Sequence, residues 1–172
     1  MAIVDNPTNV GATPIYIASQ QGHFGVVKGL VEEGKAEVDK ANNNGGTPLV
    51  AACQMGKLEV VKYLVEEGKA DVDKAANNRA IPLGIASGMG HLDVVIWLVE
   101  ECDKTDNSGM IPLFGASGNG HLKVVKCLVE VGNADVNKRD NRGLTPLFIA
   151  KLNSTNVRED IAKYLEGKGA KE

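Results

Sequence analysis

The sequence predicts an all-α fold built as a stack of five helix–turn–helix repeats. Three patterns recur in the same order along the 172 residues: a Thr-Pro or Ile-Pro dipeptide, a glycine nine residues after its Thr or Ile, and then Val-Val with Leu-Val-Glu. The dipeptides begin at Thr13, Thr47, Ile81, Ile111 and Thr145, at steps of 34, 34, 30 and 34 residues, and the first four repeats carry all three patterns. Such self-similarity indicates a repeat array, in which each repeat buries its apolar face against its neighbours.

Each repeat is expected to begin with a short helix, as the second repeat illustrates. Pro48 suits the first helical position because the N–H that proline lacks would have no partner there, and Thr47 can cap the exposed N–H groups. We expect this helix from Pro48 to Met55, with Gly56 ending it.

A second helix is expected from Leu58 to Glu67, ended by Gly68. Its apolar face is formed by residues at helical spacing: Leu58, Val61, Leu64 and Val65. The segments that join one repeat to the next are short and rich in Asp, Asn and Gly, which predicts turns.

This order of motifs resembles the ankyrin repeat. The fourth and fifth repeats show the pattern in Gly120-His121-Leu122-Lys123-Val124-Val125, Asn133-Ala134-Asp135-Val136-Asn137 and Gly143-Leu144-Thr145-Pro146-Leu147. The resemblance covers essentially the whole chain, and the usual period is about 33 residues. It implies an ankyrin-repeat solenoid in which paired helices form one layer and projecting turns make a concave face. We expect a single domain over residues 1–172, with repeats at about 4–37, 38–71, 72–102, 103–135 and 136–172.

Two departures from the pattern affect the middle of the chain. The step of 30 removes four residues at Cys102, including the glycine that ends helix two elsewhere. We therefore expect the helix starting near Leu92 to end early, around Val99. Glycines also lie in the first helices of the third and fourth repeats: Gly84, Gly88, Gly115 and Gly118. Each interior glycine costs about 1 kcal/mol relative to alanine, so the middle of the stack is expected to be its least stable part.

The two ends of the stack also differ. The last helix, expected from Val157 to Glu166, carries several charged residues, as a solvated C-terminal cap would. In the first repeat, by contrast, Ile15, Tyr16 and Ile17 look internal, as they would in a longer array.

Composition limits the classes of function. The net charge is −3 and no Lys/Arg cluster stands out, which argues against nucleic acid as a partner. No stretch reaches the roughly 18 apolar residues that a membrane-spanning helix needs. The three cysteines are odd in number and form no CxxC motif, so neither a disulfide framework nor a zinc site is indicated. We therefore expect an intracellular, cytoplasmic protein.

No group of residues suggests catalysis, a metal or a cofactor. His23, His91 and His121 occupy equivalent positions, which a stack places side by side instead of around one ion, so a turn-stabilising role is expected. No cysteine has a histidine placed nearby in the sequence to serve as its base. A glutamate pair recurs once in each of the first three repeats, as on a solvated helix face, and no phosphate-binding glycine motif is present. These observations predict a protein without enzyme activity.

The resemblance implies partner contacts on the turn tips and on the exposed ends of the first helices. The candidate contact residues are Asn43, Asn44, Gln54, Met55, Asn77, Asn78, Met89, Asn107, Ser108, Met110, Asn119, Asn141, Arg142 and Leu144. Asparagine is also a good turn former, so a purely structural role is equally open for the Asn-rich tips. Met55, Met89, Met110 and Leu144 argue more directly for contact, because exposed apolar side chains on one face indicate a binding surface. We expect a monomer that binds another protein.

A second function remains open at this point: a regulatory segment of a larger enzyme, channel or effector, in which the repeats bind their own chain. The resemblance also allows hydroxylation of Asn137, because ankyrin repeats that keep this asparagine can be substrates. The other repeats have aspartate there, at Asp39, Asp73 and Asp103.

Overall fold

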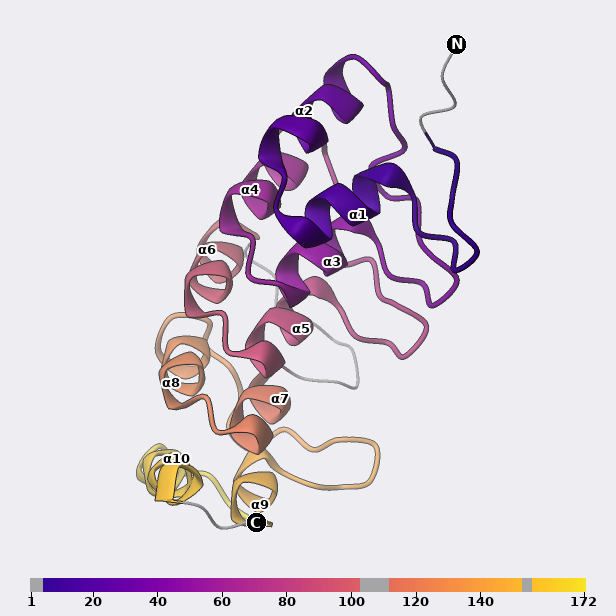
Figure 1. The fold of residues 1–172 in the computed structure, drawn as a ribbon. Coiled ribbons are helices and arrows are strands. Elements are labelled where there is room, and N and C mark those ends of the chain that lie inside the picture. Colours follow the sequence, from indigo (N-terminus) through magenta and orange to yellow (C-terminus); the bar gives the residue numbers. More distant parts are fainter. Residues whose placement is uncertain (1–4, 103–111, 153–155) are drawn as a thin grey trace. The chain divides into compact units, whose positions relative to one another are not determined.

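The computed structural model describes residues 5–102, 112–152 and 156–172. These residues form ten helices in five pairs and contain no strand, which confirms the predicted all-α repeat fold (Figure 1). The chain divides into two compact units, Met1–Pro82 and Leu83–Glu172, and each is described by itself.

The first unit contains α1 (Pro14–Gln21), α2 (Phe24–Glu32), α3 (Pro48–Gln54) and α4 (Leu58–Glu66). The predicted proline starts are confirmed, since the Thr13 and Thr47 hydroxyls accept hydrogen bonds from the Tyr16 and Val50 N–H groups at 3.3 and 3.2 Å. Helix α3 ends at Gln54, one residue before the expected Met55, which is its C-cap.

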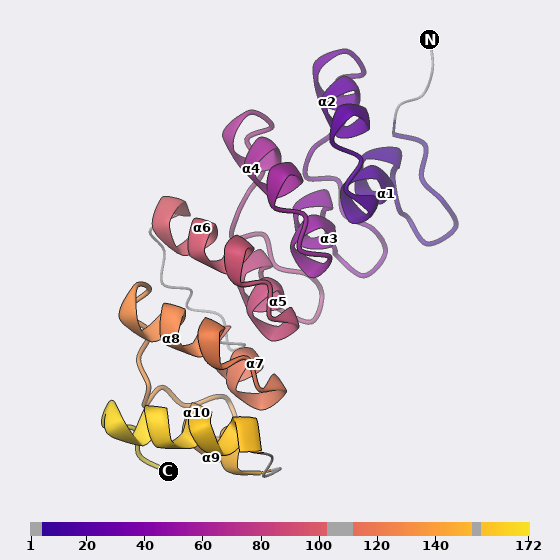
Figure 2. The ribbon, with the colours of Figure 1, turned by 60° about the vertical axis from the view of Figure 1, so that its left-hand side comes forward.

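Like helices stack on like helices in this unit, with α1 beside α3 and α2 beside α4 (Figures 1 and 2). The buried face of α4 agrees only in part with its sequence pattern. Val61 and Leu64 are buried as expected, whereas Leu58 and Val65 are half-buried, and Val60 and Tyr63 are buried as well. The reason is that α4 packs against both α2 and α3, so two sides of the helix are covered.

The second unit contains α5 (Pro82–Met89), α6 (Leu92–Cys102), α7 (Pro112–Asn119), α8 (Leu122–Glu130), α9 (Pro146–Lys151) and α10 (Asn156–Gly167). Figure 2 shows α8 between α6 and α10, while α7 packs against α9. The charged residues expected on the last helix are largely exposed, including Glu159, Asp160 and Lys163.

The prediction that α6 ends early, around Val99, is wrong. Helix α6 continues to Cys102 and has 11 residues, whereas α4 and α8 have nine. The missing glycine explains the difference, because a glycine after the last turn is a common signal that ends a helix. Without that signal the helix continues. The connection to the fourth repeat, which the deletion shortens, falls in residues 103–111, outside the described residues.

The glycines of α5 and α7 allow two helix backbones to approach closely. A Cβ placed on Gly115 would lie 3.2 Å from the Gly88 Cα, which is tighter than ordinary van der Waals contact. Gly88 and Gly115 therefore serve packing, which partly offsets the helix-propensity cost expected from the sequence.

Candidate protein-binding surface

The turn tips of the first unit are closed by backbone and side-chain hydrogen bonds. In the tip of the second repeat, the Asn42 Oδ1 accepts from the N–H groups of Asn44 and Gly46, each at 2.9 Å. The backbone N–H of Asn42 also donates to the Gly46 carbonyl at 2.9 Å. Gly45 has a φ of +78°, a left-handed conformation that glycine adopts without strain.

Successive tips are joined by a ladder of asparagine hydrogen bonds. The backbone N–H and side-chain Nδ2 of Asn43 donate to the carbonyls of Val10 and Asn9, at 3.1 and 3.3 Å. One repeat later, the same two groups of Asn77 donate to the carbonyls of Asn44 and Asn43, at 3.0 and 3.1 Å. Asn43 and Asn77 therefore hold the tips together, and the structural interpretation of asparagine gains support at these two positions.

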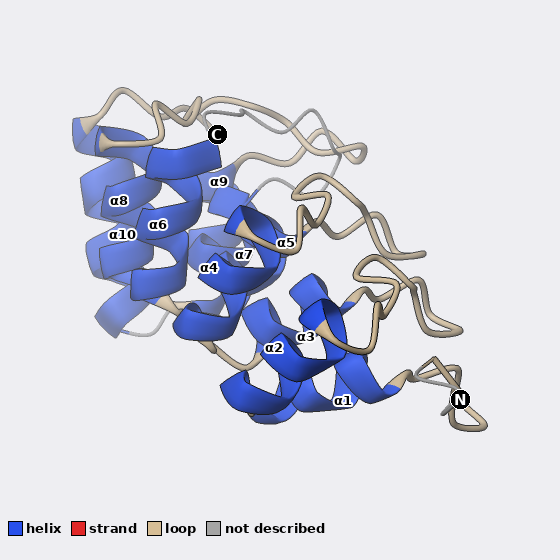
Figure 3. Ribbon diagram, turned by 90° about the horizontal axis from the view of Figure 1, so that it is seen from above, coloured by secondary structure: helices blue, strands red, loops and turns tan. Residues whose placement is uncertain are grey.

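The neighbouring asparagines differ from this pair. Asn44 is exposed, and its side chain makes no hydrogen bond within the part of the chain that is described. The Asn78 Oδ1 accepts a hydrogen bond from the Ala80 N–H at 3.0 Å. This bond does not use the side-chain Nδ2 of Asn78. Asn44 and Asn78 thus keep side-chain amide nitrogens that form no hydrogen bond within the described residues. Figure 3 shows these turns to one side of the helices of the first unit.

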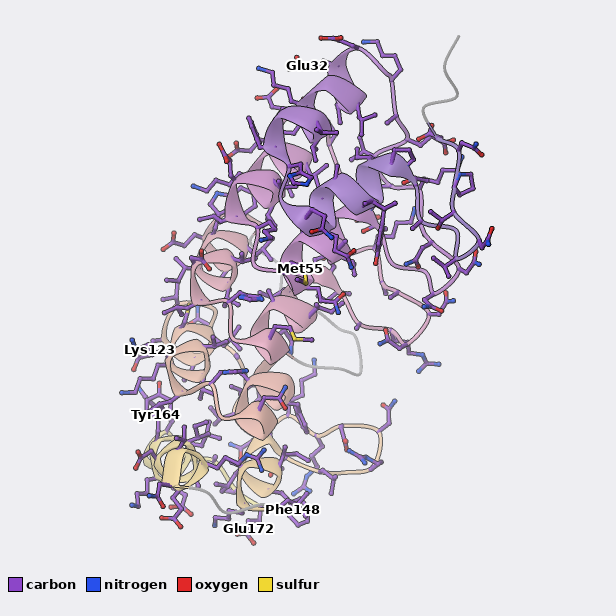
Figure 4. The ribbon with its side chains drawn as sticks, in the orientation of Figure 1. Glu32, Met55, Lys123, Phe148, Tyr164 and Glu172 are labelled. Atoms are coloured by element: carbon purple, nitrogen blue, oxygen red, sulfur yellow. The ribbon has the colours of Figure 1, made fainter. Side chains whose placement is uncertain are left out.

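Two methionines lie where the sequence predicts a contact surface. Met55 caps α3 and is 47% exposed, and Figure 4 shows its sulfur at that end of the helix. Met89, at the end of α5 in the second unit, is 51% exposed. Gln54, beside Met55, is exposed as well.

The end of α7 is more restrained. The Asn119 side chain is exposed, but its Nδ2 donates to the Gly88 carbonyl at 2.7 Å. Part of its hydrogen-bonding capacity is therefore used between the third and fourth repeats.

The tip of the fifth repeat is organised by Asp140. Its Oδ1 accepts from the N–H groups of Arg142 and Leu144, at 2.8 and 2.9 Å. Desolvation opposes ionisation of this carboxyl, but these two N–H donors and the Arg142 guanidinium outweigh it and lower the pKa of Asp140. Asn141 and Arg142 are exposed, whereas Leu144 is half-buried and offers less apolar surface than its sequence position predicts.

Three of the predicted contact residues, Asn107, Ser108 and Met110, lie outside the described residues. Two further apolar side chains, Phe148 on α9 and Leu152 at its end, are also exposed, and Figure 4 labels Phe148. The signal for Phe148 was its place where the family usually has histidine, although that position alone predicts no exposure.

His121 and His23 have different surroundings within their own units. The Nε2 of His121 lies 3.0 Å from the Gly88 carbonyl, and the ring occupies the space where a Cβ on Gly90 would stand. His23 begins α2 without a side-chain capping bond. Among the residues described, no three His, Cys, Asp or Glu side chains lie close enough together to hold a metal ion.

The described thiols are buried. Cys53 and Cys127 lie in helices and form no disulfide within the described residues, and burial, followed by the charges of Glu100 and Glu130, raises the pKa of Cys127. A raised pKa disfavours the thiolate, which is the reactive form.

The helix pairs, the proline starts and the laddered turns agree with a comparison to known families. A family model described as ankyrin repeats, in three copies, matches residues 2–76, 30–108 and 83–171. The chain belongs to the ankyrin-repeat family. Ankyrin repeats mediate protein–protein interactions and form a non-catalytic family. No curated protein matches the chain. In the described parts of this ankyrin-repeat protein, no helix combines the length and apolar character needed to cross a membrane.

Proposed function

We propose that this ankyrin-repeat protein is a non-catalytic module that binds another protein through its turn tips and the ends of its first helices. This is the surface that the family resemblance implies to be concave. The observation that carries the proposal is the exposure of Met55 and Met89 at equivalent helix ends, 47% and 51%.

Exposed methionines suit such a role. Their flexible, polarisable side chains adapt to the shape of a partner, and their burial on binding removes apolar surface from water. In the first unit, Met55 belongs to the same repeat as the Asn44 tip, which combines an apolar contact with a polar one.

The hydrogen-bond ladder through Asn43 and Asn77 supports the proposal because it lowers the conformational entropy that the tips would lose on binding. These hydrogen bonds fix the tips before a partner arrives. A surface that is already ordered loses less conformational freedom on binding, so more of the contact energy appears as affinity.

The second helices provide the matched comparison. Glu66 on α4 and Lys123 on α8 are exposed, and Figure 4 shows Lys123 on the side of α8 away from α7. We propose that this layer makes no essential partner contact, so substitutions there serve as controls.

Photo-crosslinking tests this assignment. The photoreactive residue benzoylphenylalanine would replace Met55, Met89, Glu66 or Lys123, one at a time, in the full chain mixed with a lysate of its own cells. We expect protein adducts from the Met55 and Met89 positions that are absent from the Glu66 and Lys123 positions. Adducts formed only from the two second-helix positions would overturn the proposal.

A further inference from the structure

The tip of the second repeat requires a glycine at position 45. Gly45 has a φ of +78°, a conformation that residues other than glycine rarely adopt. A Cβ added there would also lie 2.6 Å from the backbone nitrogen of Asn77 in the next tip. The close approach of the two tips therefore leaves no room for a side chain at this position.

The residue directly before this glycine is Asn44. Its side chain is exposed and forms no hydrogen bond within the described residues. An asparagine side chain is open to attack on its amide carbon by the backbone nitrogen of the residue that follows. A side chain on that following residue hinders the attack, and Gly45 has none. The fold thus requires, next to Asn44, the residue that protects its amide least.

The other described tips lack this combination. The residues before and at the left-handed position are Val10-Gly11, Asn78-Arg79 and Arg142-Gly143. Asn78 is the one asparagine among them, and the Arg79 side chain follows it. Among the tips that the structure describes, an asparagine directly before a glycine is therefore confined to the second repeat.

The turn around Asn78 matches the turn around Asn44. In both, the N–H at the left-handed position donates to the carbonyl three residues earlier, at 2.9 Å for Gly45 and 2.8 Å for Arg79. The Asn78 side chain is held in addition by the Ala80 N–H at 3.0 Å. Asn78 is thus a matched site with the same backbone turn, a bonded side chain and a larger following residue.

A second Asn-Gly pair, Asn119-Gly120, is restrained by the fold. Asn119 is the last residue of α7, and its Nδ2 donates to the Gly88 carbonyl at 2.7 Å. Attack on its amide carbon would require this bond to break and the last helical turn to open. Asn44 lies in an exposed turn, and such turns open locally at a low free-energy cost. The structure therefore restrains one Asn-Gly pair and leaves the other open.

We propose that Asn44 is a site of spontaneous deamidation, with Gly45 as the attacking residue and water as the co-reactant. The Gly45 nitrogen gives up its proton to solvent and attacks the Asn44 Cγ. The new bond closes a succinimide ring, and the Asn44 Nδ2 leaves as ammonia. Water then opens the ring: cleavage of the bond to Cγ yields aspartate, and cleavage of the bond to the backbone carbonyl carbon yields isoaspartate.

Both products change the tip. Each carries a carboxylate in place of the neutral amide of Asn44, on the surface proposed to bind a partner, and this consequence alone rests on the proposed function. Isoaspartate also alters the contact between tips, because the Asn44 carbonyl accepts from the Asn77 N–H at 3.0 Å. In isoaspartate that carbonyl leaves the main chain, which becomes one carbon longer. We therefore expect the isoaspartate form to have a lower Tm.

Peptide mapping by mass spectrometry tests the proposal. The full chain would be incubated at mildly alkaline pH, folded or in denaturant, and conversion of amide to carboxylate would be followed at Asn44, Asn78 and Asn119. In the folded chain we expect Asn44 to react at least about tenfold faster than Asn119, a factor that the loss of one hydrogen bond can supply. In denaturant the two Asn-Gly pairs should react at similar rates, and Asn78 should stay slower than both.

Two variants provide controls. Arg79→Gly keeps the left-handed turn and should raise the rate at Asn78, because no side chain then follows it. Asn44→Gln should abolish conversion in this tip, since the longer side chain closes the ring much less readily, and its Tm should not fall during incubation as that of the wild type does.

Two results would overturn the proposal. One is a folded chain in which Asn44 reacts no faster than Asn78 or Asn119. The other is a rate at Asn78 that Arg79→Gly leaves unchanged. Neither measurement depends on a partner, so a failure of the proposed function would leave both results unaltered.

Discussion

The side-chain amide of Asn77 donates a hydrogen bond to the backbone carbonyl of Asn43, 3.1 Å away and one repeat earlier in the chain. The same relation joins Asn43 to Asn9 at 3.3 Å. Residues 34 positions apart thus fix each other's turns. Two classes of asparagine follow: those that support the tips, such as Asn77, and those whose side chains are open to a partner, such as Asn44.

Replacing members of these two classes should give opposite phenotypes. Asn77→Ala removes a tip-to-tip bond and should lower the free energy of unfolding by about 0.5–1.5 kcal/mol, the range for a typical hydrogen bond. Asn44→Ala removes no side-chain bond of the described structure and should leave stability unchanged while weakening partner binding. Urea denaturation measures the first effect, and equal destabilisation by the two variants would contradict the distinction.

Glycine-to-alanine substitutions should separate helix propensity from close packing. Gly25 and Gly29 lie in α2, and a Cβ added at either position would have no neighbouring atom within 4 Å. Alanine should therefore stabilise the chain by about 0.5–1 kcal/mol at each position. Gly115→Ala should lose this gain or destabilise, because its Cβ would meet the Gly88 backbone at 3.2 Å. Stabilisation by Gly115→Ala equal to that of Gly25→Ala in denaturant titrations would show that α5 and α7 are not so close.

Tyr164 on α10 gives a pH-dependent prediction. Desolvation and a 3.0 Å hydrogen bond from its hydroxyl to Glu130 raise the pKa of Tyr164 to about 12, from an ordinary 10. Because the folded pKa is the higher one, the contribution to stability is fully present below pH 10 and is lost as the pH rises to about 12. Tyr164→Phe should therefore lose less stability than the wild type over this interval.

The pKa itself can be followed by the ultraviolet difference spectrum of tyrosinate. Glu130→Gln removes the negative charge beside the phenol and should lower the pKa of Tyr164. Lys123→Glu, also on α8, offers a comparison, because neither Lys123 nor its charge contributes to the shift. An unchanged titration in Glu130→Gln would show that the Tyr164–Glu130 contact is absent in solution.

Added metal should have no effect on stability. His121 is engaged with the Gly88 carbonyl in the second unit, whereas His23 stands at the start of α2 in the first. We expect neither zinc nor a chelator to change Tm. A melting transition that chelator lowers would point to a metal site and would contradict the structural role of these histidines.

The local signals of the sequence predict the helices well. Thr13 and Thr47 with their prolines mark helix starts, and Gly22, with a φ of +81°, marks a helix end, because each depends on a few neighbouring residues. The end of α6 at Cys102 was not predictable in this way. The sequence shows that four residues are missing from the third repeat, but it does not show whether the helix or the following connection is shortened.

The candidate surface was predicted only in part, for a similar reason. The exposure of Met55 follows from its place at the end of a first helix. The roles of Asn43 and Asn44 are indistinguishable in the sequence, because both are turn residues. Which of them turns toward the previous repeat depends on contacts with residues 34 positions away.

The central claim, that the first-helix ends form the partner-binding surface, is tested most directly by quantitative capture from a lysate of the protein's own cells. Three full-length forms would be compared, all with the wild-type circular-dichroism signal: the wild type, Met55→Glu with Met89→Glu, and the control pair Glu66→Lys with Lys123→Glu. We predict that proteins retained by the wild type and by the control pair are lost from the Met55 and Met89 variant. Equal retention by that variant, or loss from the control pair instead, would contradict the account.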